Sequence, residues 1–121
     1  METQKQILDD TIDLLSNMRN NLNDFLEQYG RFDKLEGYSK YLISDLGFVL
    51  NKKTHKLLHF KIFNKDGHEK VLIKDDMGKT SWYPIRLLVA RTFLPNDNNS
   101  NDVEHIDGDK TNNEVSNLRW V

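Results

Sequence analysis

The sequence has no cysteine among its 121 residues. This absence excludes disulfides, thiolate metal ligands and thiol nucleophiles, so a bound metal must use oxygen and nitrogen ligands, which favours a hard divalent cation. No apolar run approaches the ~18 residues that a membrane span needs, and the acidic N-terminus does not resemble a signal peptide. We therefore expect an intracellular protein that is not secreted and has no membrane partner.

The charged residues are unevenly distributed along the chain, although the formal net charge is only −2. Residues 1–30 carry 2 basic and 6 acidic side chains, residues 31–100 carry 13 and 8, and residues 101–121 carry 2 and 5. A basic middle segment suits contact with phosphate, and an acidic end suits a bound cation. Ordinary surface variation explains the same distribution, and charge alone leaves both interpretations open.

Residues 3–28 are predicted to form an amphipathic helix. Apolar residues recur at alternating steps of three and four from Leu8 to Tyr29, which is the spacing of a heptad seam. Further apolar residues widen the stripe beyond a strict seam. The helix is therefore expected either to pack on its own domain or to contact a second copy of the chain.

The middle of the sequence has the shorter period of β-strands. Alternating runs separated by glycine-containing turns predict an antiparallel meander across 41–83, in which the run "KLLHFKIF" (56–63) forms one strand. Pro84 suits the start of a helix, and helical spacing of apolar residues predicts that helix near 85–93. The predicted fold class is α+β.

The C-terminal segment reads "VEHIDGDKTNNEVSNLRWV" and is predicted to be a hairpin that pairs 103–107 with 118–121. Its histidine, His105, lies among carboxylates, which is compatible with a salt-bridged surface residue. An EF-hand loop is excluded because Asn112 occupies the sixth position, where glycine is required. The remaining interpretation is phosphodiester hydrolysis, in which a neutral histidine deprotonates water beside a cation held by an oxygen ligand.

This segment resembles the ββα-metal motif of HNH homing endonucleases encoded by introns and phages, which reads roughly V-[ND]-H-I-D-G-x-K-x-N-N-x-x-x-N-L-x-W. Upstream, "LLVARTFLPN" is similar to the helix and exit of that family. The run "EGYSKYLISDLGFVLN" is similar to a small NUMOD4-like module often joined to these nucleases. The resemblance covers 36–121 and implies a NUMOD4-like plus HNH-like nuclease domain after an N-terminal helix at 1–30.

The resemblance implies a role for each matching residue. His105 matches the catalytic general base, and Glu104 stands where the family has an Asp or Asn that binds the metal. Asn117 matches the central asparagine, which braces the hairpin loop and so orients the histidine. Asn112 and Asn113 are interpreted as turn residues. The implied cofactor is a divalent metal, Mg²⁺ or Mn²⁺.

Two departures from the family motif lead us to expect impaired catalysis. The family fold continues with a helix that carries a second metal ligand, whereas four residues follow Asn117 in this sequence. The cation would then have one protein ligand unless phosphate, another chain or Asp102 completes its site. Arg86 also stands where the family commonly has a histidine. Trp120 matches a packing residue beneath the motif.

Four lysines in the basic middle segment are candidates for DNA contact: Lys52, Lys53, Lys56 and Lys61. Lysines also protect an exposed edge strand from pairing, and this alternative stays open. The sequence thus supports three functions: a metal-dependent HNH endonuclease, a non-catalytic DNA-binding or structural derivative, or an assembly protein that self-associates through 3–28. The expected location is the host cytoplasm or nucleus, or a virion.

Overall fold

The structure is a computed structural model that describes residues 22–63 and 65–121. Its elements in chain order are α2 (Leu22–Tyr29), β1 (Phe32–Lys34), β2 (Tyr41–Ser44), β3 (Val49–Asn51), β4 (Lys56–Leu57), β5 (Lys61–Ile62), β6 (Glu69–Lys74), β7 (Thr80–Pro84), α3 (Ile85–Phe93), β8 (Val103–His105), the 3₁₀ helix η1 (Val115–Asn117) and β9 (Leu118–Trp120). The predicted mixture of helix and antiparallel sheet is confirmed. Most of the helix predicted at 3–28 lies outside the described residues.

The described strands form three antiparallel sheets, in the orders β1-β2-β3-β4, β5-β6-β7 and β8-β9. The prediction of one meander across 41–83 is therefore wrong, because these strands divide between two sheets. The run at 56–63 is not one strand: β4 ends at Leu57 and β5 begins at Lys61. Its alternating apolar residues do not share a buried face, since Phe60 is 52% and Ile62 is 46% exposed.

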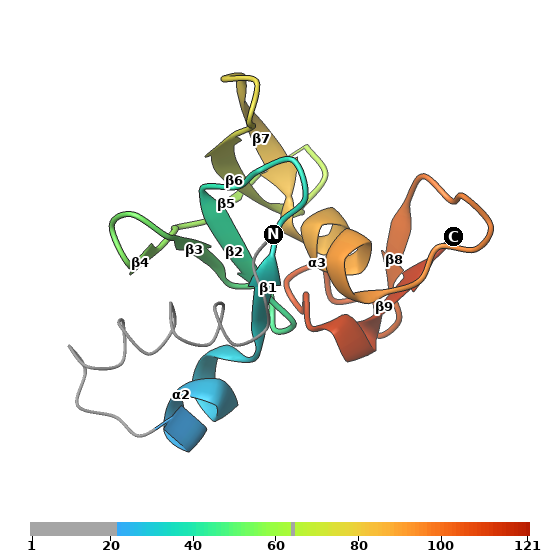
Figure 1. Ribbon diagram of the computed structural model, residues 1–121. Coiled ribbons are helices and arrows are strands. Elements are labelled where there is room, and N and C mark those ends of the chain that lie inside the picture. Colours follow the sequence, from blue (N-terminus) through green and yellow to red (C-terminus); the bar gives the residue numbers. More distant parts are fainter. Residues whose placement is uncertain (1–21, 64) are drawn as a thin grey trace.

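Helix α3 lies between the two larger sheets and the β8–β9 hairpin, and it contacts elements of all three (Figure 1). Its residues Leu88, Val89 and Ala90 are fully buried. They pack with apolar residues from β2, β6, β8 and β9 in one continuous core. The hairpin that carries His105 is thus attached to the sheets through the packing of α3.

Strand β2 is buried on both faces, because successive side chains of a strand point to opposite sides. Ile43 faces the core around α3, whereas Leu42 packs against Phe25 of α2. Helix α2 ends where Gly30 adopts a φ of 85° and donates its N–H to the Leu26 carbonyl. The described part of the predicted N-terminal helix therefore packs on its own domain, and self-association stays a prediction for the rest.

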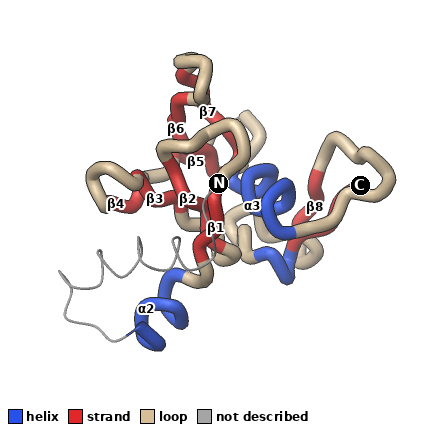
Figure 2. Tube along the Cα trace, in the orientation of Figure 1, coloured by secondary structure: helices blue, strands red, loops and turns tan. Residues whose placement is uncertain are grey.

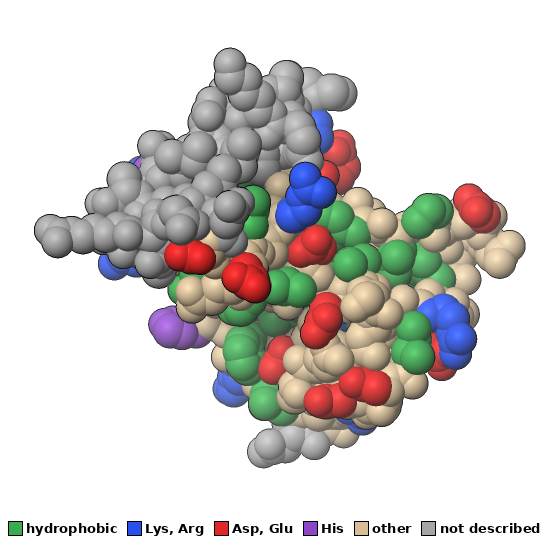
Figure 3. All heavy atoms as spheres, turned by 90° about the horizontal axis from the view of Figure 1, so that it is seen from below, with side chains coloured by type: hydrophobic (Ala, Val, Ile, Leu, Met, Phe, Trp, Pro, Cys, Tyr) green, Lys and Arg blue, Asp and Glu red, His purple; other side chains and the backbone are tan. Residues whose placement is uncertain are grey.

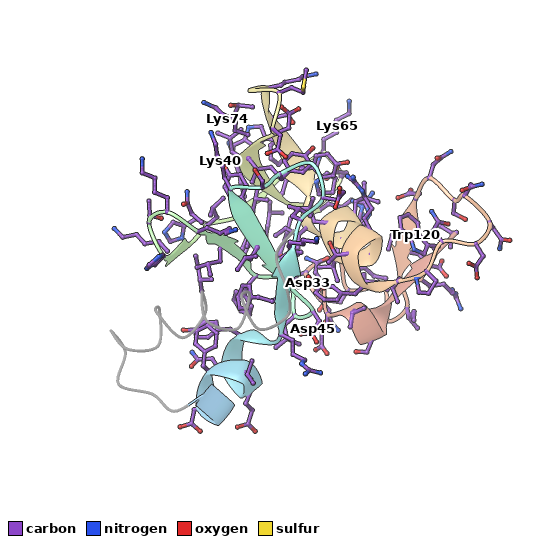
Figure 4. The ribbon with its side chains drawn as sticks, in the orientation of Figure 1. Asp33, Lys40, Asp45, Lys65, Lys74 and Trp120 are labelled. Atoms are coloured by element: carbon purple, nitrogen blue, oxygen red, sulfur yellow. The ribbon has the colours of Figure 1, made fainter. Side chains whose placement is uncertain are left out.

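Strand β8 is flanked by loops on both sides, and the second loop ends in η1 (Figure 2). The turn between β2 and β3 supports that second loop: the Asp45 carbonyl accepts a hydrogen bond from the Val115 N–H at 2.8 Å. Figure 4 shows Asp45 next to η1. None of the helices that the structure describes is long and apolar enough to cross a membrane.

Candidate functional site

His105 is the last residue of β8 and lies opposite Leu118 in the hairpin. Its Nε2 atom lies 2.8 Å from Oδ1 of Asn113. The imidazole also stacks on the ring of His68, with centroids 5.6 Å apart and ring planes 22° from parallel. The candidate base is therefore held by a hydrogen bond at its edge and by a second ring on its face.

Asn113 connects this histidine to the neighbouring sheet. Its side chain is buried, and its Nδ2 donates to Oε1 of Glu69, the first residue of β6, at 2.8 Å. Burial raises the pKa of the Glu69 carboxyl, and the hydrogen bond from Asn113 partly opposes that rise. The site thus contains a hydrogen-bonded chain from Glu69 through Asn113 to His105.

The site residues predicted from the sequence include neither the two residues that contact this histidine, Asn113 and His68, nor Glu69, which binds Asn113. Asn113 was interpreted as a turn residue, although its position in the Asn-Asn pair of the motif was a usable signal. Glu69 and His68 carried no signal, because they lie in a different predicted hairpin and no motif includes them. Only the packing of the β5–β7 sheet against the C-terminal loop brings His68 to His105 and Glu69 to Asn113.

Asn117 closes the loop that follows His105. Its Oδ1 accepts the Asp107 N–H at 3.1 Å, and its Nδ2 donates to Oδ1 of Asp107 and to the Asn112 carbonyl, both at 2.9 Å. Hydrogen bonds from Asn112, the Asp109 N–H and Asn117 lower the pKa of the Asp107 carboxyl. This geometry suits the bracing role that the family resemblance implies.

Glu104 and His105 border the same hollow of about 260 Å³, together with His68, Gly108 and Lys110. The Glu104 carboxylate, however, forms an ion pair with the guanidinium of Arg119 across the hairpin. Within residues 22–63 and 65–121, no group of three or more His, Asp or Glu side chains is arranged to hold a metal ion. The metal-binding role of Glu104 therefore stays a prediction.

The carboxylate of Asp102, which the sequence offered as a further metal ligand, is also engaged. The guanidinium of Arg86 donates to Oδ1 of Asp102 at 3.0 Å and to the Val103 carbonyl at 3.2 Å. Arg86 also affects His68: burial, followed by this nearby positive charge, lowers the pKa of His68. His68 is therefore favoured in its neutral form beside His105.

The four candidate DNA-binding lysines do not form one cluster. Lys52, Lys53 and Lys56 belong to the β3–β4 hairpin, whereas Lys61 lies on β5 in the second sheet. The β3–β4 hairpin lies at the opposite end of the molecule from β8 and β9 (Figure 1). Seen from below, the visible described surface has acidic side chains across its middle and no continuous basic area (Figure 3).

A second basic surface lies on the exposed face of the β5–β7 sheet. In the strand register, Lys61 of β5 lies opposite Lys70 of β6, and Leu72 of β6 lies opposite Trp82 of β7. The Lys61 ammonium lies 5.6 Å from the ring centroid of Phe63 and 5.9 Å from that of Trp82. Lysines therefore lie beside aromatic rings on this face, of which the Trp82 ring is exposed.

Two uncharacterized HNH endonucleases of Acanthamoeba polyphaga mimivirus are 38% and 40% identical to this chain over 89 and 86 residues. The DNA endonuclease I-HmuI of Bacillus phage SP01 is 38% identical over 89 residues. A solved structure of the HNH homing endonuclease I-HmuI, described as showing DNA binding and cleavage, matches with a TM-score of 0.66 and 33% identity over 74% of this chain. Sequence and fold relate this chain to the HNH homing endonucleases.

The relationship covers only part of those longer proteins. The alignments span 72%, 71% and 72% of this chain, but 22% and 26% of the mimivirus proteins and 49% of I-HmuI. The match to the solved structure spans 51% of that chain. No protein-family model matches the sequence. The NUMOD4-like assignment, the division at 1–30 and 36–121 and the second metal ligand of an HNH site stay predictions for this chain.

Proposed function

We propose that this chain is the DNA-binding and catalytic part of an HNH-type endonuclease that hydrolyses a phosphodiester bond with the help of a divalent cation. The observation that carries the proposal is His105, which borders a hollow at the end of β8, directly before a loop closed by Asn117. The fold around it is similar to that of I-HmuI. His105 is the proposed general base, and Asn117 is the residue that keeps its loop in place.

The hollow suits hydrolysis of a phosphate diester in two respects. A neutral imidazole at its border takes a proton from water, which makes that water a better nucleophile. Lys110 lines the same hollow, and its charge is available to a phosphate oxygen, although its Nζ donates to the Asp66 carbonyl at 2.6 Å. His68 supports the base by stacking on its ring.

A divalent cation in this site would stabilise the negative charge that develops on the phosphate and the leaving oxygen. Glu104 is the proposed protein ligand, because it is a hard oxygen donor beside the base. The described residues do not complete a donor set, and Glu104 pairs with Arg119. Mg²⁺ or Mn²⁺ is the cation to test.

We assign DNA contact to the basic surfaces of the two sheets. Lys52, Lys53 and Lys56 offer charge to phosphates from the β3–β4 hairpin. Lys61 lies with Trp82 on the β5–β7 face, where charge and an exposed ring contact backbone and bases respectively. The I-HmuI structure, which is similar in fold, is described as showing DNA binding.

Plasmid nicking in Mg²⁺ or Mn²⁺ tests the proposal. His105→Ala is expected to remove most activity, since general-base assistance contributes roughly 10²–10⁴ in rate. The matched control is His59→Ala, because His59 is exposed and lies between β4 and β5. Binding without nicking by the unsubstituted chain would favour the non-catalytic alternative. Equal nicking by both histidine variants would contradict the assignment of His105.

A further inference from the structure

We propose that Glu69 and Asn113 are positioning residues that hold His105 in the tautomer protonated on Nε2, so that Nδ1 is the atom that accepts the proton from water. This inference rests on the proposed nuclease function for its catalytic meaning. Its structural content concerns the histidine ring and can be measured without any cleavage.

The first step of the argument is the orientation of the Asn113 amide. A carboxylate only accepts hydrogen bonds, whereas an amide has one end that donates and one that accepts. Glu69 therefore requires the NH₂ group of Asn113, and the contact is 2.8 Å long. The carbonyl oxygen of the same amide must then face His105. Reversing the amide would place its oxygen against the carboxylate and its NH₂ group against Nε2.

The second step is the tautomer of the imidazole. Oδ1 of Asn113 only accepts, so Nε2 of His105 must carry the hydrogen in their 2.8 Å contact. In a neutral imidazole the other nitrogen then has a free lone pair. Among the described residues, Nδ1 of His105 has no hydrogen-bond partner, and the ring borders the hollow that Glu104 also lines.

The third step is the rigidity of Asn113. Its side chain is 5% exposed, so water does not readily replace either partner. The backbone beneath it is closely packed: a Cβ added to Gly47 would lie 3.1 Å from Cβ of Asn113. The neighbouring Asn112, by contrast, donates its Nδ2 to Asp107 and has no contact with His105 among the hydrogen bonds of the described residues. Asn112 is therefore the natural control.

The test is ¹⁵N NMR of the histidine rings in this chain, recorded near ~pH 8.5, well above the ordinary histidine pKa of about 6.5. The His105 signals are assigned by their loss in His105→Gln. In the unsubstituted chain we expect a protonated Nε2 and an unprotonated Nδ1. Asn113→Ala should move the two nitrogen shifts toward each other, as a mixture of tautomers requires. Asn112→Ala should leave them in place.

A second variant, Glu69→Gln, keeps the shape of the glutamate side chain. It is therefore expected to fold even if Asn113→Ala does not. The glutamine amide donates as well as accepts, so the Asn113 amide is free to reverse. We expect the His105 ring to become a tautomer mixture while the backbone amide spectrum stays that of a folded protein. A ring protonated on Nδ1 in the unsubstituted chain, or ring shifts unchanged in both Asn113→Ala and Glu69→Gln, would overturn the proposal.

Nicking assays separate this inference from the proposed function. If the chain nicks DNA, Asn113→Ala and Glu69→Gln should lower kcat with little change in KM, because they act on the orientation of the base and not on DNA contact. A ring that responds as expected in a chain without nicking activity supports the positioning and contradicts the nuclease function. A nicking chain whose ring does not respond overturns the positioning and leaves the function standing.

Discussion

Glu104 and Arg119 lie opposite each other across the β8–β9 hairpin, and Nε of Arg119 donates to the Glu104 carboxylate at 2.6 Å. A cation that enters the hollow beside His105 must therefore compete with this guanidinium for its proposed protein ligand. The side chains of Glu104 and Arg119 are 40% and 64% exposed, respectively, so solvent screens the pair. Exposed pairs of this kind contribute at most about 1 kcal/mol.

Replacing Arg119 with alanine should therefore strengthen cation binding, by up to about fivefold. The measurement is isothermal titration calorimetry with Mn²⁺. Arg91→Ala is the control, because that guanidinium contacts the Tyr83 hydroxyl on another part of the molecule. Weaker binding in Arg119→Ala would show that the arginine helps to build the site instead of competing for it.

Gly47→Ala should destabilise the fold and disturb the loop that holds Asn113. A side chain at a φ of 94° costs about 1–3 kcal/mol in backbone strain. The added Cβ would in addition lie 3.1 Å from the Asn113 side chain. Gly78→Ala is a matched control, since Gly78 has a φ of 92° and no atom within 4 Å of an added Cβ. The difference in unfolding free energy between the two variants, measured in urea, isolates the contact between the added Cβ and Asn113. Equal destabilisation would show that this contact contributes nothing.

Asn117→Ala should cost about 1–3 kcal/mol of unfolding free energy, because it removes three part-buried hydrogen bonds that the Asn117 side chain makes with the loop. Asn112→Ala removes a single hydrogen bond to Asp107, which is exposed to solvent, and should therefore cost less unfolding free energy. Urea denaturation compares the two. If both variants are destabilised equally, Asn117 does not brace the loop more than its neighbour does.

The contribution of Asp107 should depend on pH. Hydrogen bonds lower its pKa below the ordinary value of 3.8 in the folded state. The stabilisation is therefore present above about pH 4 and is lost as pH falls through the lowered folded pKa. The stability advantage of the unsubstituted chain over Asp107→Asn, measured by urea unfolding, should narrow from neutral pH toward pH ~2. A constant difference would contradict the assignment.

DNA affinity should fall steeply with salt if the lysines bind phosphates. Each lysine–phosphate interaction that a Lys→Ala change removes should reduce the salt slope of log K by about 0.9 and weaken binding to all sequences similarly. Variants at Lys53 and at Lys61 test the two sheets separately, by fluorescence anisotropy between about 50 and 200 mM salt. A slope that is unchanged at one position removes that sheet from the proposed interface.

The sequence predicted which residues lie together in the C-terminal hairpin better than it predicted how the sheets are arranged. His105 and Asn117 could be predicted to lie close together because both belong to one short motif, and the bonds from Asn117 to Asp107 are local in the chain. Their catalytic roles stay predictions. Glu69 was not found, because it meets Asn113 across 44 residues of sequence. Contacts between elements depend on packing angles that residue spacing does not encode.

The division of the strands was missed for a related reason. The alternation of apolar residues at 56–63 is typical of one half-buried strand. Such alternation indicates extended backbone but does not indicate which strand it pairs with. Here Lys56 pairs with Asn51 of β3, whereas Lys61 pairs with Lys70 of β6. β1 was missed because Phe32–Lys34 is too short to show a period. The helical residues of α2 were indicated by their heptad spacing, and the earlier part of that stripe is not described.

The contacts of the loop after His105 also set an order of assembly. Gly47 and Glu69, which receive this loop, precede Asn113 by 66 and 44 residues and leave the ribosome before it. Both sheets are therefore synthesised before the asparagine that orients the imidazole is available. On this account the nascent chain acquires its architecture first and the contacts that orient His105 last. Under the proposed nuclease function, incomplete chains would then be folded in part but inactive.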